Sequence, residues 1–463
     1  MKLQIIFFLF LVPVIISGQK NFDQFNYSWV NLGDEGFTAG TVEYIGFKFS
    51  PSGEPFIAYR DSVNFYKASV MKFDGTNWEY VGIPGFTSWV AQDISLAFDP
   101  VDGEPCISFT DFANAGKVTV KKFNGINWID IGNEGFSDGY AVNTCLEFNP
   151  EDMKPYVAYI DLDHEQKPAV KKLDGNNWIN VGTAGFSIGT TAFLNLAFSE
   201  TNEPYVAFVD HACSSKVTVM KYTGTEWINV GLPGFSPSPS GEISFAFDPA
   251  DGKPCVAYAN IVNNSGKLSM MKFNGSTWQF EGNENFSGGL SLSPSLAFSP
   301  YDGSPYVAFS EITNKNSQKA TVMRYDGSTW GYVGINGFSS GESSWNKLAF
   351  SSNGQPYVAF EDYGNEKKAT VIYFDAPADV IKKELLKCSV FPNPTEKFLT
   401  INLTRTPGYK SAIEIIDVCG KLLFGTTIQN NNITIDLSEY PSGIYFIRIT
   451  NNDLENCYRF CKS

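Results

Sequence analysis

Seven tryptophans divide most of this chain into units of nearly equal length. They recur every 49 to 52 residues and nearly all open W-x-x-V-G or a close variant, followed by G-F-[ST]; they are Trp29, Trp78, Trp128, Trp178, Trp227, Trp278 and Trp330. Self-similarity at such a period indicates a repeat protein, in which each unit buries its apolar face against its neighbours. The repeat therefore constrains the fold more strongly than length or composition does.

Each unit holds three further segments of strand length and composition. In one copy these segments are residues 195–198, 204–208 and 216–222. The middle segment is apolar throughout, as expected of a strand covered on both faces, whereas the third alternates apolar and polar residues. Turns such as Asp74-Gly75 connect the third segment to the tryptophan segment, because Asp-Gly and Asn-Gly favour tight hairpins.

We therefore predict an all-β chain in which residues 24–375 form a seven-bladed β-propeller with four strands per blade. Counting from Tyr44 gives six complete blades. The seventh, residues 344–374, lacks an outer strand, while the strand that begins at Trp29 has no blade of its own. We expect this N-terminal strand to complete the last blade, which closes the ring and removes its open sheet edges.

The N-terminus has the parts of a secretory signal peptide, which we place at residues 1–18. Lys2 precedes an apolar run over residues 5–16 that is too short to span a bilayer, and Ser17 and Gly18 follow. No later apolar run approaches about 18 residues, so we expect a chain that does not span a membrane. The formal net charge of −15 argues against nucleic acid as a partner, because it repels a phosphate backbone.

After Asp375 the repeat stops, and a linker over residues 376–386 leads to a distinct segment over residues 387–463. Short alternating strands, such as residues 433–437 and 444–449, are separated by Gly, Pro and Asn. This pattern predicts a small C-terminal β-sandwich.

The same segment carries a set of short motifs. They are Phe391-Pro392-Asn393-Pro394, Ile416-Asp417-Val418, Asp436-Leu437-Ser438, Gly443-Ile444-Tyr445 and the basic end over residues 459–462. Together they resemble the type A C-terminal sorting domain of the type IX secretion system of Bacteroidota. That resemblance implies handling by the type IX secretion machinery and a secreted or cell-surface location, and it leaves surface attachment and free release both open.

The cysteines do not predict a disulfide framework for the propeller. Four of them fall in four different blades, where we expect buried free thiols: Cys106, Cys145, Cys213 and Cys255. The tail holds four more, among which one or two bridges are possible.

Two sequence patterns that resemble enzyme motifs lack the structural surroundings that those motifs require. The D-G-[ST]-x-W hairpins are similar to the Asp-box turns of sialidase-like propellers, but they lack one residue between Asp and Gly. Sialidase chemistry also needs an arginine triad, and the repeats hold only Arg60 and Arg324. Three G-x-S-x-G segments lie between strands rather than in the strand-turn-helix context of a hydrolase nucleophile: residues 135–139, 185–189 and 337–341.

A polar residue near the end of the second strand recurs in every repeat and should ring one face of the propeller. The residues are Asp61, Asp111, Asp161, Asp210, Asn260, Glu311 and Asp362. One interpretation is that these side chains accept backbone N–H bonds and hold the following loop. The other is that they converge on a polyol or on a cation, for which oxygen ligands would suit Ca²⁺; no other cofactor is expected.

Both histidines of the chain lie in this loop of two adjacent blades, next to several acids. The weak metal candidates are Asp161, Asp163, His164, Asp210 and His211, with Cys213 beside them. Exposed histidines are also common in variable loops, which is the alternative interpretation.

Four aromatic residues that do not repeat lie between an outer strand and the next inner strand: Trp89, Tyr140, Phe193 and Trp345. They are candidates for ligand binding, since aromatic rings commonly hold sugars and peptides. Alternatively they fill gaps between neighbouring blades, because buried rings contribute a large apolar area.

From these features we expect a secreted or cell-surface propeller that binds a glycan or a protein and has no catalytic activity. A glycan hydrolase or lyase with carboxylates from different blades is the first alternative, with the irregular acids Asp138, Glu242 and Glu342 to be considered. A structural or adhesive spacer is the second alternative.

Overall fold

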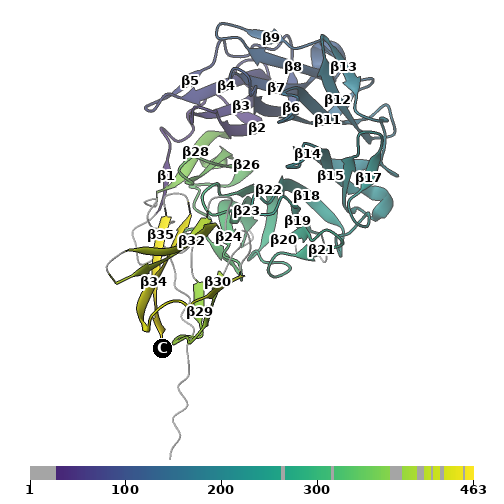
Figure 1. The fold of residues 1–463 in the computed structure, drawn as a ribbon. Coiled ribbons are helices and arrows are strands. Elements are labelled where there is room, and N and C mark those ends of the chain that lie inside the picture. The colour runs from purple at the N-terminus through teal and green to yellow at the C-terminus, as the bar shows by residue number, and fades with distance from the viewer. Residues whose placement is uncertain are drawn as a thin grey trace, which may run out of the picture.

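The computed structural model describes residues 28–261, 266–313, 318–375, 388–403, 411–418, 421–427, 432–451 and 454–463. The predicted signal peptide and linker lie outside these residues. The repeats form seven four-stranded antiparallel sheets around a common axis (Figure 1). The predicted all-β propeller is therefore confirmed. No helix in the described ranges is long and apolar enough to cross a membrane.

The first six blades each consist of four strands that are consecutive in the chain. Blade 1 comprises β2 (Val42–Phe49), β3 (Pro55–Asp61), β4 (Lys67–Phe73) and β5 (Trp78–Tyr80). Blade 2 comprises β6 (Ala91–Phe98), β7 (Pro105–Asp111), β8 (Lys117–Phe123) and β9 (Trp128–Asp130). Blade 3 comprises β10 (Ala141–Phe148), β11 (Pro155–Asp161), β12 (Lys167–Asp174) and β13 (Asn177–Asn180).

The remaining blades follow the same order. Blade 4 comprises β14 (Thr191–Phe198), β15 (Pro204–Asp210), β16 (Lys216–Tyr222) and β17 (Trp227–Asn229). Blade 5 comprises β18 (Ser240–Phe247), β19 (Pro254–Asn260), β20 (Leu268–Phe273) and β21 (Trp278–Phe280). Blade 6 comprises β22 (Leu290–Phe298), β23 (Pro305–Ile312), β24 (Lys319–Tyr325) and β25 (Trp330–Tyr332). Blade 7 comprises β26 (Ser343–Phe350), β27 (Pro356–Asp362), β28 (Lys368–Asp375) and β1 (Ser28–Asn31).

The N-terminal strand closes the ring, as the sequence predicts. Strand β1 pairs antiparallel with β28, with Trp29 opposite Phe374. The Trp29 indole donates a hydrogen bond to the Val333 carbonyl oxygen at 2.8 Å, and its ring stacks on Phe338 at 4.3 Å. Two segments far apart in sequence are thus joined in one sheet, in which β1 covers the outer edge of β28 and supplies the fourth strand of blade 7.

The same joint connects every pair of neighbouring blades. Each repeat tryptophan donates to a backbone carbonyl of the preceding outer-strand segment at 2.7 to 3.0 Å. Each also stacks on the phenylalanine of the preceding G-F-[ST] segment, with ring centroids 4.0 to 4.5 Å apart. The repeated Trp and Phe are therefore the residues that fix one blade against the next.

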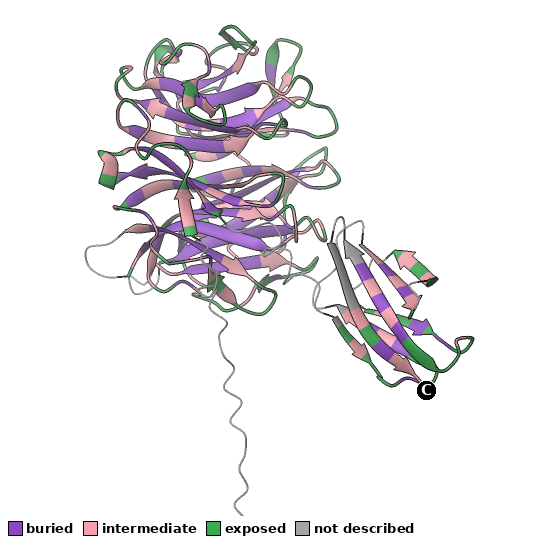
Figure 2. Cartoon of the chain, turned by 90° about the vertical axis from the view of Figure 1, so that its left-hand side faces the viewer, coloured by how far each residue is buried: buried purple, intermediate pink, exposed green. Residues whose placement is uncertain are grey.

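The second strand of each blade lies in the interior, and nearly all of its residues are buried (Figure 2). Cys106 and Cys255 are buried free thiols there, and Cys145 and Cys213 are also free. Burial raises the pKa of Cys145 to about 11. Cys106 and Cys255 are therefore buried small hydrophobes, as predicted, whereas Cys145 and Cys213 are only half-buried.

A bulge interrupts each inner strand near its start, where the pairing register shifts. We call the seven residues at this position the bulge ring; they are Tyr44, Asp93, Asn143, Phe193, Glu242, Ser293 and Trp345. Six of them have positive φ, Glu242 being the exception. Phe193 and Trp345 therefore lie within strands β14 and β26 rather than in connectors, because a bulge is invisible to period-two patterning.

The tail forms two sheets with a shared apolar core. One has the strand order β29-β30-β33 and the other β32-β31-β34-β35. The strands are β29 (Cys388–Phe391), β30 (Phe398–Leu403), β31 (Ser411–Asp417), β32 (Leu422–Thr427), β33 (Asn432–Asp436), β34 (Gly443–Asn451) and β35 (Leu454–Lys462). Residues from both sheets, including Leu399, Ile401, Ile413 and Ile447, pack in this core, so the predicted small β-sandwich is confirmed.

Candidate functional site

The polar residues at the ends of the second strands hold the loops that follow them. Asp111 is representative: its Oδ1 accepts a bond from the Ala113 N–H at 2.9 Å, and its Oδ2 accepts from Asn114 and from Thr119, both at 2.8 Å. Asp61 and Asp362 make the equivalent three bonds. All three carboxylates are buried, so their oxygens are used inside the protein.

The candidate metal residues use their polar atoms in local contacts. The His164 Nδ1 lies 2.9 Å from Asp161, which raises the pKa of His164. The Asp210 carboxylate accepts from the Ala212 N–H at 2.9 Å, and His211 Nδ1 is 2.9 Å from the Ser215 hydroxyl. Within the described part of the chain, no group of three or more His, Cys, Asp or Glu side chains is placed to hold a metal ion.

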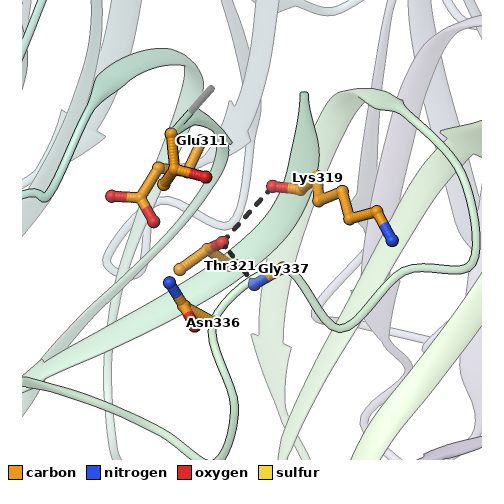
Figure 3. Close-up of a pocket in the computed structure, with 6 residues that line it drawn as sticks. Glu311, Lys319, Thr321, Asn336 and Gly337 are labelled. Atoms are coloured by element: carbon orange, nitrogen blue, oxygen red, sulfur yellow. Dashed lines mark hydrogen bonds between the residues drawn. The ribbon is translucent and has the colours of Figure 1, made fainter. Parts of the chain in front are cut away.

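Glu311 has the longest side chain of these seven residues. It turns to the connector before the inner strand of its blade and accepts bonds from the Gly288 and Gly289 N–H groups at 2.8 and 3.1 Å. A cavity of about 150 Å³ lies beside it, lined also by Lys319, Thr321 and Asn336 (Figure 3).

The serines of the G-x-S-x-G segments are structural. Ser137, Ser187 and Ser339 each donate a hydrogen bond to the carbonyl of the glycine two residues later, at 2.6 to 2.8 Å. The Ser137 oxygen also accepts a bond from the Val118 N–H at 3.0 Å. These hydroxyls shape the connector between two strands, which agrees with the rejection of a nucleophile elbow.

The four candidate aromatic residues occupy different settings. Trp89 is 61% exposed on a connector. Tyr140 packs edge-on against Phe112 at 5.9 Å. The Trp345 ring centroid lies 4.8 Å from that of Tyr44, and Trp345 packs on a core cluster. Phe193 lies in blade 4, which is not a neighbour of blade 1. Trp89 and Trp345 are thus the two that flank blade 1.

Arg60 of blade 1 lies between the elements that carry Trp89 and Trp345, and it is not among the site residues predicted from the sequence. Arg60 is the penultimate residue of β3 and pairs across the strands with Glu43, with which it forms an ion pair. Its guanidinium lies 4.9 Å from the Tyr44 ring centroid and 5.2 Å from that of Tyr66. Both rings therefore make cation–π contacts with one largely buried arginine.

The position of Arg60 is uncharged in five of the seven blades, where the residues are Thr110, Ile160, Val209, Ala259 and Ser310. In blade 7 it is Glu361, which accepts a hydrogen bond from Ser344. A charged residue therefore occupies this position only in blades 1 and 7, which are neighbours in the ring. This departure from the repeat pattern is visible in the sequence and could have identified the site.

A second departure lies in the loop after β3. Phe65 and Tyr66 both have left-handed backbone conformation, with φ of 58° and 60°. The same left-handed pair recurs in blades 2, 3, 4 and 7, so the aromatic side chains and not the backbone set blade 1 apart; the equivalent pairs are Ala115-Gly116, Glu165-Gln166, Ser214-Ser215 and Glu366-Lys367. Bulky residues rarely adopt this conformation, and such strain concentrates at functional sites. It leaves the Phe65 side chain 79% exposed.

These side chains gather on one face of the ring, formed by the loops between second and third strands and the connectors to the next inner strand. The Ala91 N–H bonds the Tyr66 carbonyl at 3.0 Å, which holds the Trp89 connector beside the Phe65 loop. Asp93 of the bulge ring lies near Arg60, and burial raises the pKa of its carboxyl. We call Tyr44, Arg60, Phe65, Tyr66, Trp89, Asp93 and Trp345 the blade-1 cluster.

Comparison with solved structures finds low similarity in sequence. PorZ, a surface component of the type IX secretion system of Porphyromonas gingivalis, is 15% identical; the match has a TM-score of 0.47 and covers 92% of this chain but only 60% of PorZ. An ulvan lyase is 10% identical with a TM-score of 0.45, over 75% of this chain and 95% of the lyase. An intramolecular trans-sialidase from Ruminococcus gnavus is 12% identical with a TM-score of 0.41, over 74% and 96%.

No curated protein sequence matches the chain. Residues 389–461, however, match the family described as secretion system C-terminal sorting domain. This match agrees with the two-sheet fold of the tail and with the motifs that its sequence carries. The tail is therefore a type IX sorting domain, and the chain is a secreted or cell-surface protein that joins this domain to a seven-bladed β-propeller.

Proposed function

We propose that the propeller is a binding module that holds a glycan on the blade-1 cluster. The observation that carries this proposal is the exposure of Phe65 from a strained backbone conformation, beside the exposed ring of Trp89. Aromatic faces stack on the apolar faces of sugar rings, and a bulky residue in the left-handed region costs about 1 to 3 kcal/mol. The left-handed pair recurs in other blades, but among the described loops only that of blade 1 fills it with two aromatic residues, Phe65 and Tyr66, which supports a ligand-binding role for them.

The surroundings of these rings suit a hydroxyl-bearing ligand. Tyr66 is fixed by its contact with Arg60, and Tyr44 is held between Arg60 and Trp345. Rigid rings bind with little loss of conformational freedom. Asp93 is half-buried in this cluster, and its carboxyl oxygens can accept bonds from sugar hydroxyls.

A glycan array probed with the purified secreted chain tests the proposal. Trp89→Ala should weaken binding of the best glycan by about tenfold, or about 1.4 kcal/mol, with little change in melting temperature, because Trp89 is exposed. Trp345 packs on the core, so Trp345→Ala is expected to lower stability as well. Ile126→Ala is the matched control, since Ile126 is 77% exposed in a hairpin at the opposite ends of the strands.

Absence of binding to every glycan would overturn this proposal. Capture of a protein partner that is lost in Trp89→Ala but kept in Ile126→Ala would assign the same surface to a protein ligand instead.

A glycan hydrolase or lyase is the second candidate, favoured by one observation. Burial raises the pKa of both Asp93 and Glu361, which lie on either side of Arg60 in neighbouring blades. Carboxyls with raised pKa can serve as general acids. Turnover of the bound glycan that disappears in Asp93→Asn would support this candidate over a binding module.

A further inference from the structure

The charges of the blade-1 cluster constrain what kind of saccharide it can hold. The carboxyls in this region are Glu43, Asp93 and Glu361, and the cations are Arg60 and Lys367. Lys367 lies over the Tyr363 ring, 4.6 Å from its centroid. Carboxyls therefore outnumber cations around the rings.

Arg60 is already engaged by Glu43 and by two tyrosine rings. Its Nη2 is bonded to Glu43, and the rings of Tyr44 and Tyr66 lie against the guanidinium. Its Nε is buried and has no hydrogen-bond partner. A guanidinium recognises an anion best through a pair of N–H groups in its plane, and the ion pair at Nη2 and the burial of Nε make the Nε–Nη2 edge unavailable for that geometry.

The carboxyl groups, in contrast, are acceptors in a poorly solvated setting. Burial raises the pKa of Asp93 and of Glu361, although hydrogen bonds from Asn143 and Thr110 and the charge of Arg60 lower the former and the Ser344 hydrogen bond lowers the latter. Sugar hydroxyls donate to such oxygens. A uronate or sulfate instead brings a like charge, which is destabilising in a site of low effective dielectric constant.

We infer that the blade-1 cluster selects neutral, hydroxyl-rich saccharides over acidic ones. This inference rests on the proposed glycan-binding function and adds the ligand class. It assigns Asp93 as a residue that determines specificity and Arg60 as a positioning residue that orients the two tyrosine rings.

The test compares a neutral oligosaccharide with its own acidic form. The probes are the neutral oligosaccharide with the strongest array signal and the same compound after oxidation of its primary hydroxyls to carboxylates. Calorimetric titration of the full secreted chain should give binding at least about tenfold weaker for the oxidised form at low ionic strength. The difference should largely persist at about 0.5 M salt, because charges that are partly buried are screened much less than exposed ones.

Two isosteric variants separate the local charge from the net charge. Asp93→Asn should reduce the discrimination, and Asn tolerates the φ of 48° at this position. Asp74→Asn removes the same charge from a hairpin on the opposite face, and Asn occupies the equivalent position in blades 2 and 5; it should leave the discrimination unchanged.

Equal or tighter binding of the oxidised form overturns the inference while glycan binding itself stands. Equal effects of Asp93→Asn and Asp74→Asn also overturn it, because the selection would then follow net charge. Failure of the neutral compound to bind at all would instead remove the proposed function.

Discussion

Blades 1 and 2 hold the loop after the second strand with the same set of hydrogen bonds to a buried aspartate, which we call the loop frame. They place different side chains in that loop. In blade 1, Asp61 accepts bonds from the Val63 N–H, the Asn64 amide and the Ser69 hydroxyl; in blade 2, Asp111 accepts from Ala113, Asn114 and Thr119. The two left-handed positions that follow hold Phe65 and Tyr66 in blade 1, but Ala115 and Gly116 in blade 2.

This difference separates the parts of the repeat that maintain the fold from those that are free to vary. The Asp, its Asn and its hydroxyl partner form a buried polar network, and such networks tolerate little change. The two left-handed positions are outside that network, so they can take residues that locally disfavour the conformation when the side chains serve another purpose. In the blade-1 cluster these two positions hold Phe65 and Tyr66.

The largest expected effect is on stability, when the aspartate of the loop frame is removed. Asp61→Ala and Asp111→Ala should each lower the free energy of unfolding by about 3 kcal/mol, because three donors lose a buried acceptor. Denaturant midpoints of both variants would measure this loss. Asp111→Asn, which places in blade 2 the residue found in blade 5, should cost clearly less. A much smaller loss in Asp61→Ala than in Asp111→Ala would show that the two loops do not share one frame.

A smaller effect, of opposite sign for stability and binding, is expected at the left-handed positions. Phe65→Gly should raise the free energy of unfolding by about 1 kcal/mol, since glycine adopts this conformation freely and the exposed ring makes few contacts. The same variant should weaken glycan binding several-fold. Ala115→Gly is the matched variant in blade 2 and should stabilise similarly without any effect on binding. A destabilised Phe65→Gly would mean that the ring supports the fold.

The smallest effect concerns the pH dependence of stability. Burial raises the pKa of Asp93, so the native state binds a proton at pH values where the unfolded carboxyl, with a pKa of about 3.9, has released it. The stability contribution of Asp93 is then lost as pH rises from about 4 to its folded pKa. Asp93→Asn does not titrate, so its melting temperature relative to the parent protein should increase through this window and then level off.

Asp302 offers the contrasting case for that measurement. Although burial raises its pKa, Arg324 at 2.7 Å and hydrogen bonds lower it overall. Its ionised form is favoured in the native state, so its contribution should be lost as pH falls below about 4. A flat difference between Asp93→Asn and the parent protein across the acidic range would contradict the role assigned to burial at Asp93.

Much of the architecture could be predicted from the sequence. The strand order within a blade followed from the apolar second segment and the Asp-Gly and Asn-Gly turns, and the orphan strand at Trp29 predicted the closure. The bulges could not be predicted, since a local register shift depends on contacts with the neighbouring inner strands. As a result Phe193 and Trp345 were assigned to connectors.

The candidate site was predicted only in part. Trp89 and Trp345 were singled out because they do not repeat, yet the same criterion also selects Arg60, Glu361 and the Phe65-Tyr66 pair. Arg60 and Glu361 lie within the second strands β3 and β27, and Phe65 and Tyr66 lie in the loop after β3, where the neighbouring positions follow the repeat closely. The sequence shows that a polar residue recurs near the end of each second strand, but whether its side chain faces solvent or the loop is decided by burial.

The sequence by itself determined the blade, because strand patterning, turn residues and the Trp–Phe pairs act over short distances and recur seven times. Tertiary structure alone decided which of the residues that depart from the repeat lie close together. Arg60 and Asp93 come from different blades. Tyr44 and Trp345 are in contact although they lie at opposite ends of the propeller sequence. Closure of the ring brings blade 7 against blade 1, so the position of the site depends on a contact between residues about 300 apart, which no local pattern encodes.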